Sequence, residues 1–187
     1  MDKININNLT GKCLAAMPTV EGSFAHSLVL ICSHSAEGAM GLIINRPFEN
    51  MSFGELAYSL PLDSKTNLPI PLYNGGPLEK EKGFIIHDAG KTYPDSYAIN
   101  DNIYITSSPQ ILQDISLQKG PREFLITLGF AGWMPSQLEN EISGNLWLVT
   151  EATPELVFLD SSADKWNFAL SSLGINKTNF SLPLGHS

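Results

Sequence analysis

The sequence predicts an α+β domain in which short strands, several of them paired as hairpins, are interspersed with short helices. Two observations lead to this prediction. Short apolar runs bounded by Gly, Pro or Asn recur along the chain, which is typical of buried strands. Between them lie segments with apolar residues three to four positions apart, which begin at Ser or Pro residues suited to a helix N-terminus. Because strands and helices do not alternate regularly, a doubly wound parallel sheet is the second choice.

Length and composition bound the protein's class. A chain of 187 residues, 43% hydrophobic and 16% charged, is long enough for one domain with a substantial core. The formal net charge is −8, and only 11 Lys and Arg residues are present. Nucleic acids and anionic membranes attract basic surfaces, so we expect neither as a direct partner.

The sequence also indicates a cytosolic protein without metal or cofactor. The first residues are polar, and no apolar run approaches the roughly 20 residues of a membrane span. Cys13 and Cys32 lie in separate apolar runs and are expected as buried free thiols. The four histidines show no metal-ligand spacing, and nucleotide-binding and hydrolase motifs are absent.

The N-terminal third predicts a strand, a hairpin and a helix. Pro18 stops the first strand, and the turn-like residues 34–39 join the two strands of the hairpin. Ser52 and Glu55 have the spacing of a capping box, and Pro61 ends the helix that follows. The expected strands are residues 12–17, 27–32 and 40–45.

The middle of the chain predicts further strands and a second helix. Residues 79–82, with the sequence EKEK, are expected to be an exposed charged turn before a buried strand. Asn100-Asp101-Asn102 forms the turn of another hairpin. Ser108-Pro109 begins the second helix, with Ser as N-cap and Pro at the first position. The strands are residues 70–73, 83–87, 97–99 and 103–106.

The C-terminal third is organised around a corner that follows a buried strand, residues 124–130. Gly129 and Gly132 allow a sharp turn. A short third helix follows, which begins either with Pro135 at its first position or with a capping box of Ser136 and Glu139. Two strands and a last helix follow, and Gly174 ends that helix. The strands are residues 146–150 and 156–159, the helix is 163–173, and residues 1–10 and 176–187 are expected as loose tails.

Several motifs in this order resemble the AlgH/YqgE-like family of bacterial proteins of unknown function. The motifs are GAMGLIINRP (38–47), GGP (75–77), GFIIH (83–87), LGFAGW (128–133) and the run from 137 to 148. The resemblance implies a strongly curved, bifurcated, mostly antiparallel sheet that closes toward a pseudo-barrel, flanked by about four short helices. It supplies no established activity, although the family name comes from a proposed link to transcriptional regulation. The family's usual Arg is replaced here by His26.

Arg46 is the first candidate for a ligand contact. Pro47 holds it extended at the end of a strand, next to Asn45, so its guanidinium group is oriented to bind a carboxylate or phosphate. The alternative is an internal salt bridge, for example to Glu139 or Glu141.

Two further candidates lie at loops and strand ends. Gly75 and Gly76 could present backbone N–H groups to an anion, or could mark a tight crossing of two chain segments. His87 ends a strand and is either a hydrogen-bonded structural residue or a base or ligand. His34, in a turn, is expected to be solvated.

The corner supplies the last candidates. Gln137 and Glu141 share a helix face at i, i+4 and could line a pocket beside Trp133. The alternative is that Trp133 and Trp147 are core anchors and that the carboxylates are solvated.

Together these residues predict a non-catalytic binding or regulatory protein that acts through a surface groove for a small ligand or a protein partner. The alternative is an enzyme for a small anionic substrate, with Arg46 as anion clamp and His87 or Glu141 as base. A homo-oligomer is left open. The groove hypothesis places Asn45, Arg46, Gly75, Gly76, His87, Trp133, Gln137 and Glu141 around one cleft.

Overall fold

The computed structural model describes residues 6, 8–62 and 67–175. Its strands are β1 (Lys12–Ala16), β2 (Leu28–Ser35), β3 (Gly38–Ile43), β4 (Pro47–Ser52), β5 (Pro71–Asn74), β6 (Leu78–Asp88), β7 (Tyr97–Ala98), β8 (Ile103–Thr106), β9 (Phe124–Trp133) and β10 (Trp147–Glu151). Its helices are α1 (Phe53–Ser59), α2 (Pro109–Ser116), α3 (Gln137–Ser143), α4 (Pro154–Val157) and α5 (Ser162–Ser172), with a 3-10 turn at Gly22–Phe24.

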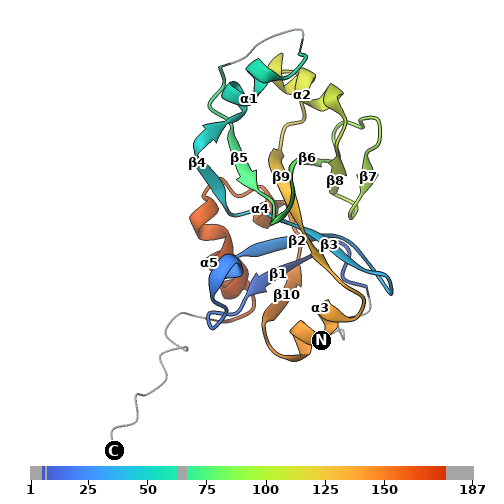
Figure 1. The fold of residues 1–187 in the computed structure, drawn as a ribbon, viewed down its shortest axis with the longest axis vertical. Coiled ribbons are helices and arrows are strands. Elements are labelled where there is room, and N and C mark those ends of the chain that lie inside the picture. The colour runs from blue at the N-terminus through green and yellow to red at the C-terminus, as the bar shows by residue number, and fades with distance from the viewer. Residues whose placement is uncertain (1–5, 7, 63–66, 176–187) are drawn as a thin grey trace, which may run out of the picture.

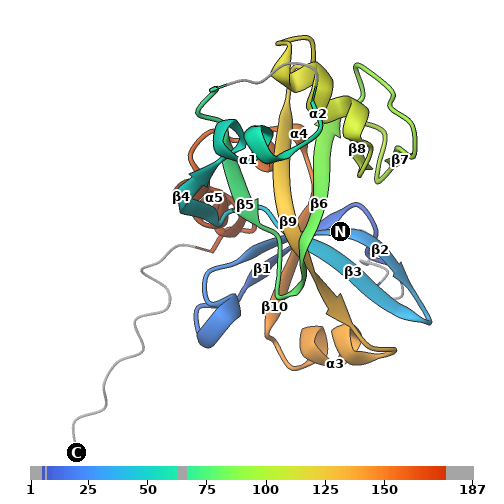
Figure 2. The ribbon, with the colours of Figure 1, turned by 45° about the horizontal axis from the view of Figure 1, so that its top comes forward.

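The strands form a curved, mostly antiparallel sheet that branches along β9 (Figure 1). The order is β10-β1-β2-β3-β9-β6-β8-β7, and β5 adds beside β9 in parallel, with β4 beside β5. The first half of β9 pairs with β5 and β6, whereas its second half pairs with β3. One strand therefore belongs to both an upper and a lower half of the molecule, as Figure 2 shows.

Glycines make this branch possible. Gly129 has φ +75°, a conformation that other residues rarely adopt. Gly76 lies so close to β9 that a Cβ there would be 2.1 Å from the carbonyl carbon of Phe130. Gly75 donates its N–H to the Leu128 carbonyl. The tight crossing that the glycine pair predicted is therefore present.

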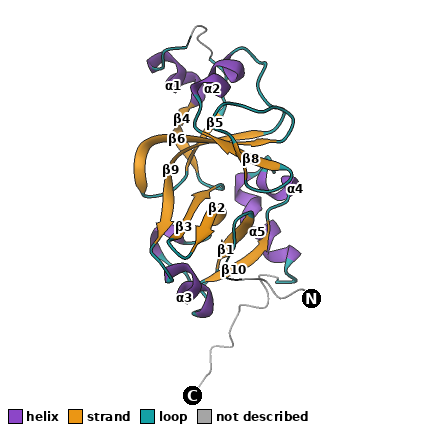
Figure 3. Ribbon diagram, turned by 90° about the vertical axis from the view of Figure 1, so that its right-hand side faces the viewer, coloured by secondary structure: helices purple, strands orange, loops and turns teal. Residues whose placement is uncertain are grey.

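Three apolar clusters fill the fold. The largest lies inside the curl of the sheet and is covered by α4 and α5. The outer face of the lower half packs against α3, and the outer face of the upper half packs against α1 and α2 (Figure 3). Helices therefore pack on both faces of the curved sheet. Because the side chains on both faces are buried, the buried strands have continuous apolar sequences.

Much of the sequence-based assignment is confirmed. β2 and β3 form the expected hairpin, although both strands extend to a tight turn after Ser35. Ser52 and Glu55 form the predicted capping box at α1. Ser108 accepts from Gln110 N–H at the start of α2, and β7 and β8 form the second hairpin.

Two assignments are wrong, and one strand is missing from the sequence-based prediction. Residues 156–159 are not a strand, because Thr153 caps the short helix α4, accepting from the N–H of Leu156. Residues 79–82 are not a turn but an exposed part of β6, in which Glu79 and Lys82 form an ion pair at 3.3 Å. β4 begins at Pro47 and was not predicted, because four of its six residues are exposed and its sequence, PFENMS, shows no regular apolar alternation.

The predicted tails have different outcomes. Residues 176–187 lie outside the described part of the chain. At the other end, Leu9 is fully buried and its N–H donates to His34 at 3.1 Å, so the expected loose tail is wrong from this residue onward. None of the helices in the described residues has the length and apolarity needed to cross a membrane.

Candidate functional site

A pocket of about 570 Å³ opens between the loop before β2, the end of β3 and helix α5. It contains two of the residues that the sequence singled out, Asn45 and Arg46, together with an aromatic wall from α5. The lining residues are Pro18, Ala25, His26, Asn45, Arg46, Ala163, Trp166, Asn167 and Leu170.

Arg46 lies where the chain leaves β3 for β4, and it also lines a shallower depression over β4. Its guanidinium donates to the carbonyl oxygens of Ser23 and Ala25, the latter at 2.6 Å. Partial burial lowers the pKa of Arg46, but a guanidinium stays charged at neutral pH. Two of its five N–H groups are thus engaged with the 23–25 turn, and the cation faces the pocket from a fixed position.

Asn45 ties the same loop to β2. Its Oδ1 accepts from the N–H of Leu28 at 2.8 Å, and its Nδ2 donates to the carbonyl of His26 at 2.9 Å. His26 has φ 57°, an uncommon conformation for a residue other than glycine. Its ring packs edge-on against Trp166, with 4.6 Å between centroids. Asn45 therefore shapes the pocket wall, with its amide oxygen and its amide nitrogen each in a hydrogen bond to the loop or to β2.

Helix α5 supplies the opposite wall. The indole of Trp166 donates to the Ala16 carbonyl at 2.9 Å, and Lys165 is fully buried with its ammonium bonded to the carbonyls of Ile44 and Val157. These bonds anchor α5 to β1 and to the end of β3. Next to them, Oδ1 of Asn167 is buried without a hydrogen-bond partner in the described part of the chain. An unsatisfied buried acceptor at a pocket wall is a candidate ligand contact.

His87 has a structural role in the upper half. It is fully buried, its Nδ1 bonds to the Asp88 carbonyl at 2.7 Å, and its Nε2 bonds to Ser96 Oγ at 3.2 Å. Desolvation lowers its pKa below the usual value, so the ring is neutral at physiological pH. Of the two interpretations, the hydrogen-bonded structural residue is the one that these contacts favour.

Trp133, Gln137 and Glu141 form a second polar cluster at the corner. The carboxylate of Glu141 accepts from the indoles of Trp133 at 2.8 Å and Trp147 at 2.7 Å, and from Nε2 of Gln137 at 2.8 Å. The expectation of core tryptophans is correct, but Glu141 is bound to them and not simply solvated. The capping box at Ser136 does not form, because Ser136 has φ 63° and its side chain makes no cap bond.

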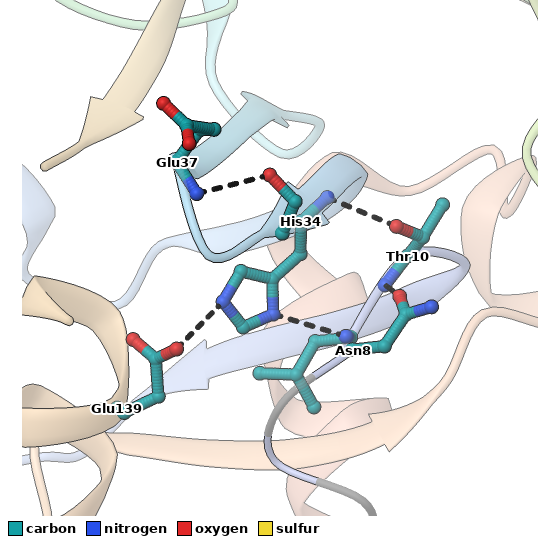
Figure 4. Close-up of polar contacts among 7 residues, drawn as sticks. Asn8, Thr10, His34, Glu37 and Glu139 are labelled. Carbon is teal, nitrogen blue, oxygen red and sulfur yellow. Dashed lines mark hydrogen bonds and ion pairs between the residues drawn. The ribbon is translucent and has the colours of Figure 1, made fainter. Parts of the chain in front are cut away.

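Glu139 has a different partner from the one proposed for it. Figure 4 shows the imidazole of His34 between the carboxylate of Glu139 and the backbone next to Asn8. Nδ1 accepts from the N–H of Leu9, so the proton lies on Nε2, which is 3.1 Å from Glu139 Oε1. His34 is buried, and the expectation that it is solvated is wrong. No pattern in the sequence indicates this contact, which joins residues 105 positions apart.

Comparison with known proteins agrees with this architecture. A model of the AlgH-like family matches residues 13–178. The chain belongs to the AlgH-like family. It is 37% identical to a UPF0301 protein of Photobacterium profundum, covering 96% of this chain and 100% of that protein. It is 40% identical to a UPF0301 protein of Paraburkholderia phymatum, with 96% of each covered.

Solved structures show the same fold as this AlgH-like protein. The AlgH protein of Pseudomonas aeruginosa matches with a TM-score of 0.78 at 32% identity, and each chain is fully covered. Protein DIP2367 of Corynebacterium diphtheriae matches with a TM-score of 0.73 at 23% identity, over 88% of this chain and 86% of that one. The latter likeness shows the fold alone.

In this AlgH-like protein the predicted site residues separate into four places. Asn45 and Arg46 share the pocket; Gly75 and Gly76 are enclosed at the strand crossing. His87 lies within the upper half, and the cluster at Trp133 lies at the corner by α3. The single cleft proposed from the sequence therefore does not form. The salt bridge from Arg46 to Glu139 or Glu141 is also wrong, since those carboxylates have other partners.

The described residues form neither an anion-binding loop at Gly75 and Gly76 nor a metal site. The backbone N–H of Gly75 donates to Leu128 and that of Gly76 to the Asn74 side chain at 3.2 Å, so these groups are not presented to an anion. Within residues 8–62 and 67–175, no three His, Cys, Asp or Glu side chains are arranged to hold a metal. The residues that sequence reasoning missed are His26, Trp166 and Asn167, which come together only through the fold.

Proposed function

We propose that this AlgH-like protein is a cytosolic, non-catalytic binding protein whose pocket between the 18–26 loop, Arg46 and α5 takes a small anionic ligand. The supporting observation is the pairing of a fixed cation with an unsatisfied acceptor. Arg46 and Asn167 line the same pocket, and Oδ1 of Asn167 is buried without a partner among the described residues. A ligand with an anionic group and an N–H or O–H donor would satisfy both.

The pocket has the construction of a binding site. Its volume of about 570 Å³ falls in the range of small-molecule sites. Trp166 and His26 give it a rigid aromatic wall, and the bonds from Trp166 to Ala16 and from Asn45 to His26 hold that wall in place. Such a wall binds a ligand without a large ordering cost.

The enzyme alternative finds less support. It requires His87 or Glu141 to act as a base near Arg46, and neither lines the pocket or the depression to which Arg46 belongs. Both nitrogens of His87 and both oxygens of Glu141 already have partners. Two free, buried cysteines suit the reducing cytosol.

A thermal-shift screen against carboxylates, phosphates and nucleotides tests the proposal. A ligand specific for the native state adds about 2.7 kcal/mol of stability at a hundredfold excess over its dissociation constant. Asn167→Leu removes the acceptor at similar volume, and Asn140→Leu, on exposed α3, is the matched control. We expect the shift to disappear in the first variant and to persist in the second. Equal shifts in both would contradict the proposal.

A further inference from the structure

The ligand pocket continues along strand β4. Arg46, which lines the pocket, is followed directly by β4, and the depression over this strand is lined by Arg46, Asn74 and residues 47–51. The depression has a volume of about 530 Å³, and Arg46 is common to it and to the pocket of about 570 Å³. Figures 1 and 2 place β4 on the same side of the molecule as α5, which supplies a wall of the pocket. Pocket and depression therefore make up one groove, the Arg46 groove.

The backbone of β4 is only partly paired. Strand β5 pairs with it at Pro47 and Ser52, and the register shifts between these two residues. Glu49 and Asn50 thus have no opposite residue in β5, and no other strand within residues 8–62 and 67–175 pairs with β4. Unpaired N–H and C=O groups on an extended strand are the groups to which a second extended segment adds. The β4 side of the Arg46 groove is therefore suited to bind an extended peptide.

Arg46 has hydrogen-bonding capacity left for an anion. Its Nη1 and Nη2 atoms each donate to a loop carbonyl, those of Ser23 and Ala25. A guanidinium has five N–H groups, so three remain without a partner among the described residues. No carboxylate in that part of the chain forms an ion pair with Arg46. A cation that is held in place and not neutralised from within is suited to bind a carboxylate that a ligand supplies.

The other contacts in the pocket match the last residue of a peptide. Oδ1 of Asn167 is a buried acceptor without a partner among the residues described, and a terminal residue other than proline carries an N–H next to its carboxylate. Pro18, Trp166 and Leu170 give the same pocket apolar surface for a side chain. A terminal residue with an apolar side chain therefore combines the anion, the donor and the apolar group that these features bind.

We propose that the Arg46 groove binds the carboxyl terminus of an extended peptide from a partner protein. The terminal carboxylate bonds to Arg46, and the last side chain enters the pocket beside Trp166. The preceding residues lie antiparallel along β4, because β4 runs away from Arg46 and the peptide runs toward it. Residues 47–51 span about 17 Å, the length of about five residues of an extended peptide. This inference rests on the proposed function, since it names the ligand class of the same pocket.

Glu49 gives the groove a preference within the peptide. It is exposed on β4, three residues beyond Arg46, and no Lys or Arg in the described part of the chain pairs with it. In the antiparallel arrangement, the third residue before the terminal one lies near Glu49. The net charge of −8 also attracts basic peptides. We therefore expect a Lys or Arg at that position of the peptide.

Isothermal titration calorimetry with the full-length protein tests the inference. The probe is an acetylated pentapeptide that ends in leucine, with lysine three residues before it and alanine elsewhere. We expect it to bind at least about tenfold more tightly than the same peptide with a C-terminal amide, which offers Arg46 no carboxylate. It should exceed N-acetylleucine by a similar factor, because N-acetylleucine keeps the carboxylate and the N–H but has no residues to lie along β4.

Two charge-reversal variants test the placement along β4. Glu49→Lys should weaken binding of the probe about fivefold, because the lysine of the peptide then meets a like charge. Glu37→Lys makes the same change in net charge at the exposed turn between β2 and β3, and it should leave the affinity unchanged. Equal weakening in both variants would contradict the placement.

Two further results would overturn the inference. Equal affinity of the acid and the amide would mean that Arg46 does not bind the terminal carboxylate. Equal affinity of the pentapeptide and N-acetylleucine would confine binding to the pocket, which overturns the peptide and leaves the proposed function intact. Absence of binding by all three probes, together with no shift in the thermal-shift screen, would contradict the proposed function as well.

Discussion

The burial of Lys165 makes the stability of this protein depend on pH in a specific way. Its side chain is 0% exposed, its ammonium bonds to the carbonyls of Ile44 and Val157 at 3.1 and 2.7 Å, and it lies 5.3 Å from the ring centroid of Tyr73. Desolvation is the largest effect on this group and lowers the pKa of Lys165 from 10.5 to about 8. The native state therefore releases this proton more readily than the unfolded state does.

The sign and size of the effect follow from proton binding in the two states. Below about pH 8 both states are protonated, and the native state bears the full cost of the buried charge. Between about pH 8 and 10.5 the unfolded state binds more protons, so this lysine makes stability rise with pH by about 1.4 kcal/mol per unit. The total rise is about 3 kcal/mol.

The buried thiols act in the opposite direction. Burial raises the pKa of Cys13 from 9.0 to about 12 and raises that of Cys32 further, so the unfolded thiols lose protons first and stability falls above about pH 9. Lys165→Met keeps both thiols. The difference in unfolding free energy between wild type and variant therefore reports mainly the lysine, together with the smaller effect of its charge on the pKa of Cys13.

Urea unfolding followed by tryptophan fluorescence, under reducing conditions, measures that difference. The variant leaves two carbonyls without a donor, which lowers its stability at every pH, so only the change with pH is diagnostic. We expect the difference, wild type minus variant, to rise by about 3 kcal/mol between pH 7.5 and 10.5. A difference that stays constant over this range would refute the reasoning.

Three further outcomes are expected. Glu141→Gln removes a charged acceptor shared by two indoles and should lower the free energy of unfolding in urea by about 2–4 kcal/mol. The exposed control Glu155→Gln should lower it by under about 0.5 kcal/mol. Equal losses in the two variants would contradict the role of Glu141. Gly76→Ala should abolish folding, as judged by circular dichroism, because its Cβ would lie 2.1 Å from the backbone of β9. The control Gly22→Ala, with open space around it, should cost only about 1–2 kcal/mol of stability. A folded Gly76→Ala variant would contradict the close approach of Gly76 to β9. Cys13 should react with a thiol reagent only at the rate of unfolding; rapid reaction of the native protein would count against its burial.

The elements that could be predicted from the sequence are those marked by apolar runs or by helix-capping residues. The hairpin of β2 and β3 and the capping box of Ser52 could be read directly, because burial and local hydrogen bonds determine them. β4 and the charged part of β6 could not, since strands with exposed residues carry no apolar period. The 156–159 run was misread because a four-residue apolar stretch suits a strand and a single helical turn equally well.

The candidate site was predictable only in part, for a similar reason. Pro47 indicated correctly that Arg46 is held at the end of a strand, and the structure places it in a pocket. Its partners are backbone carbonyls, which leave no residue-specific signal in a sequence. Trp166 and Asn167 reach the same pocket from a helix 120 residues away along the chain. Only the curl of the sheet brings them together.

The most direct test of the proposed function uses the three tryptophan indoles as reporters. Those of Trp133 and Trp147 both bond to Glu141, whereas that of Trp166 bonds to Ala16 at the wall of the pocket. In an NMR titration with an anionic ligand from the thermal-shift screen, we expect the Trp166 indole signal to move and the other two to stay. Movement of the Trp133 and Trp147 signals with Trp166 unchanged would contradict the assignment of the site.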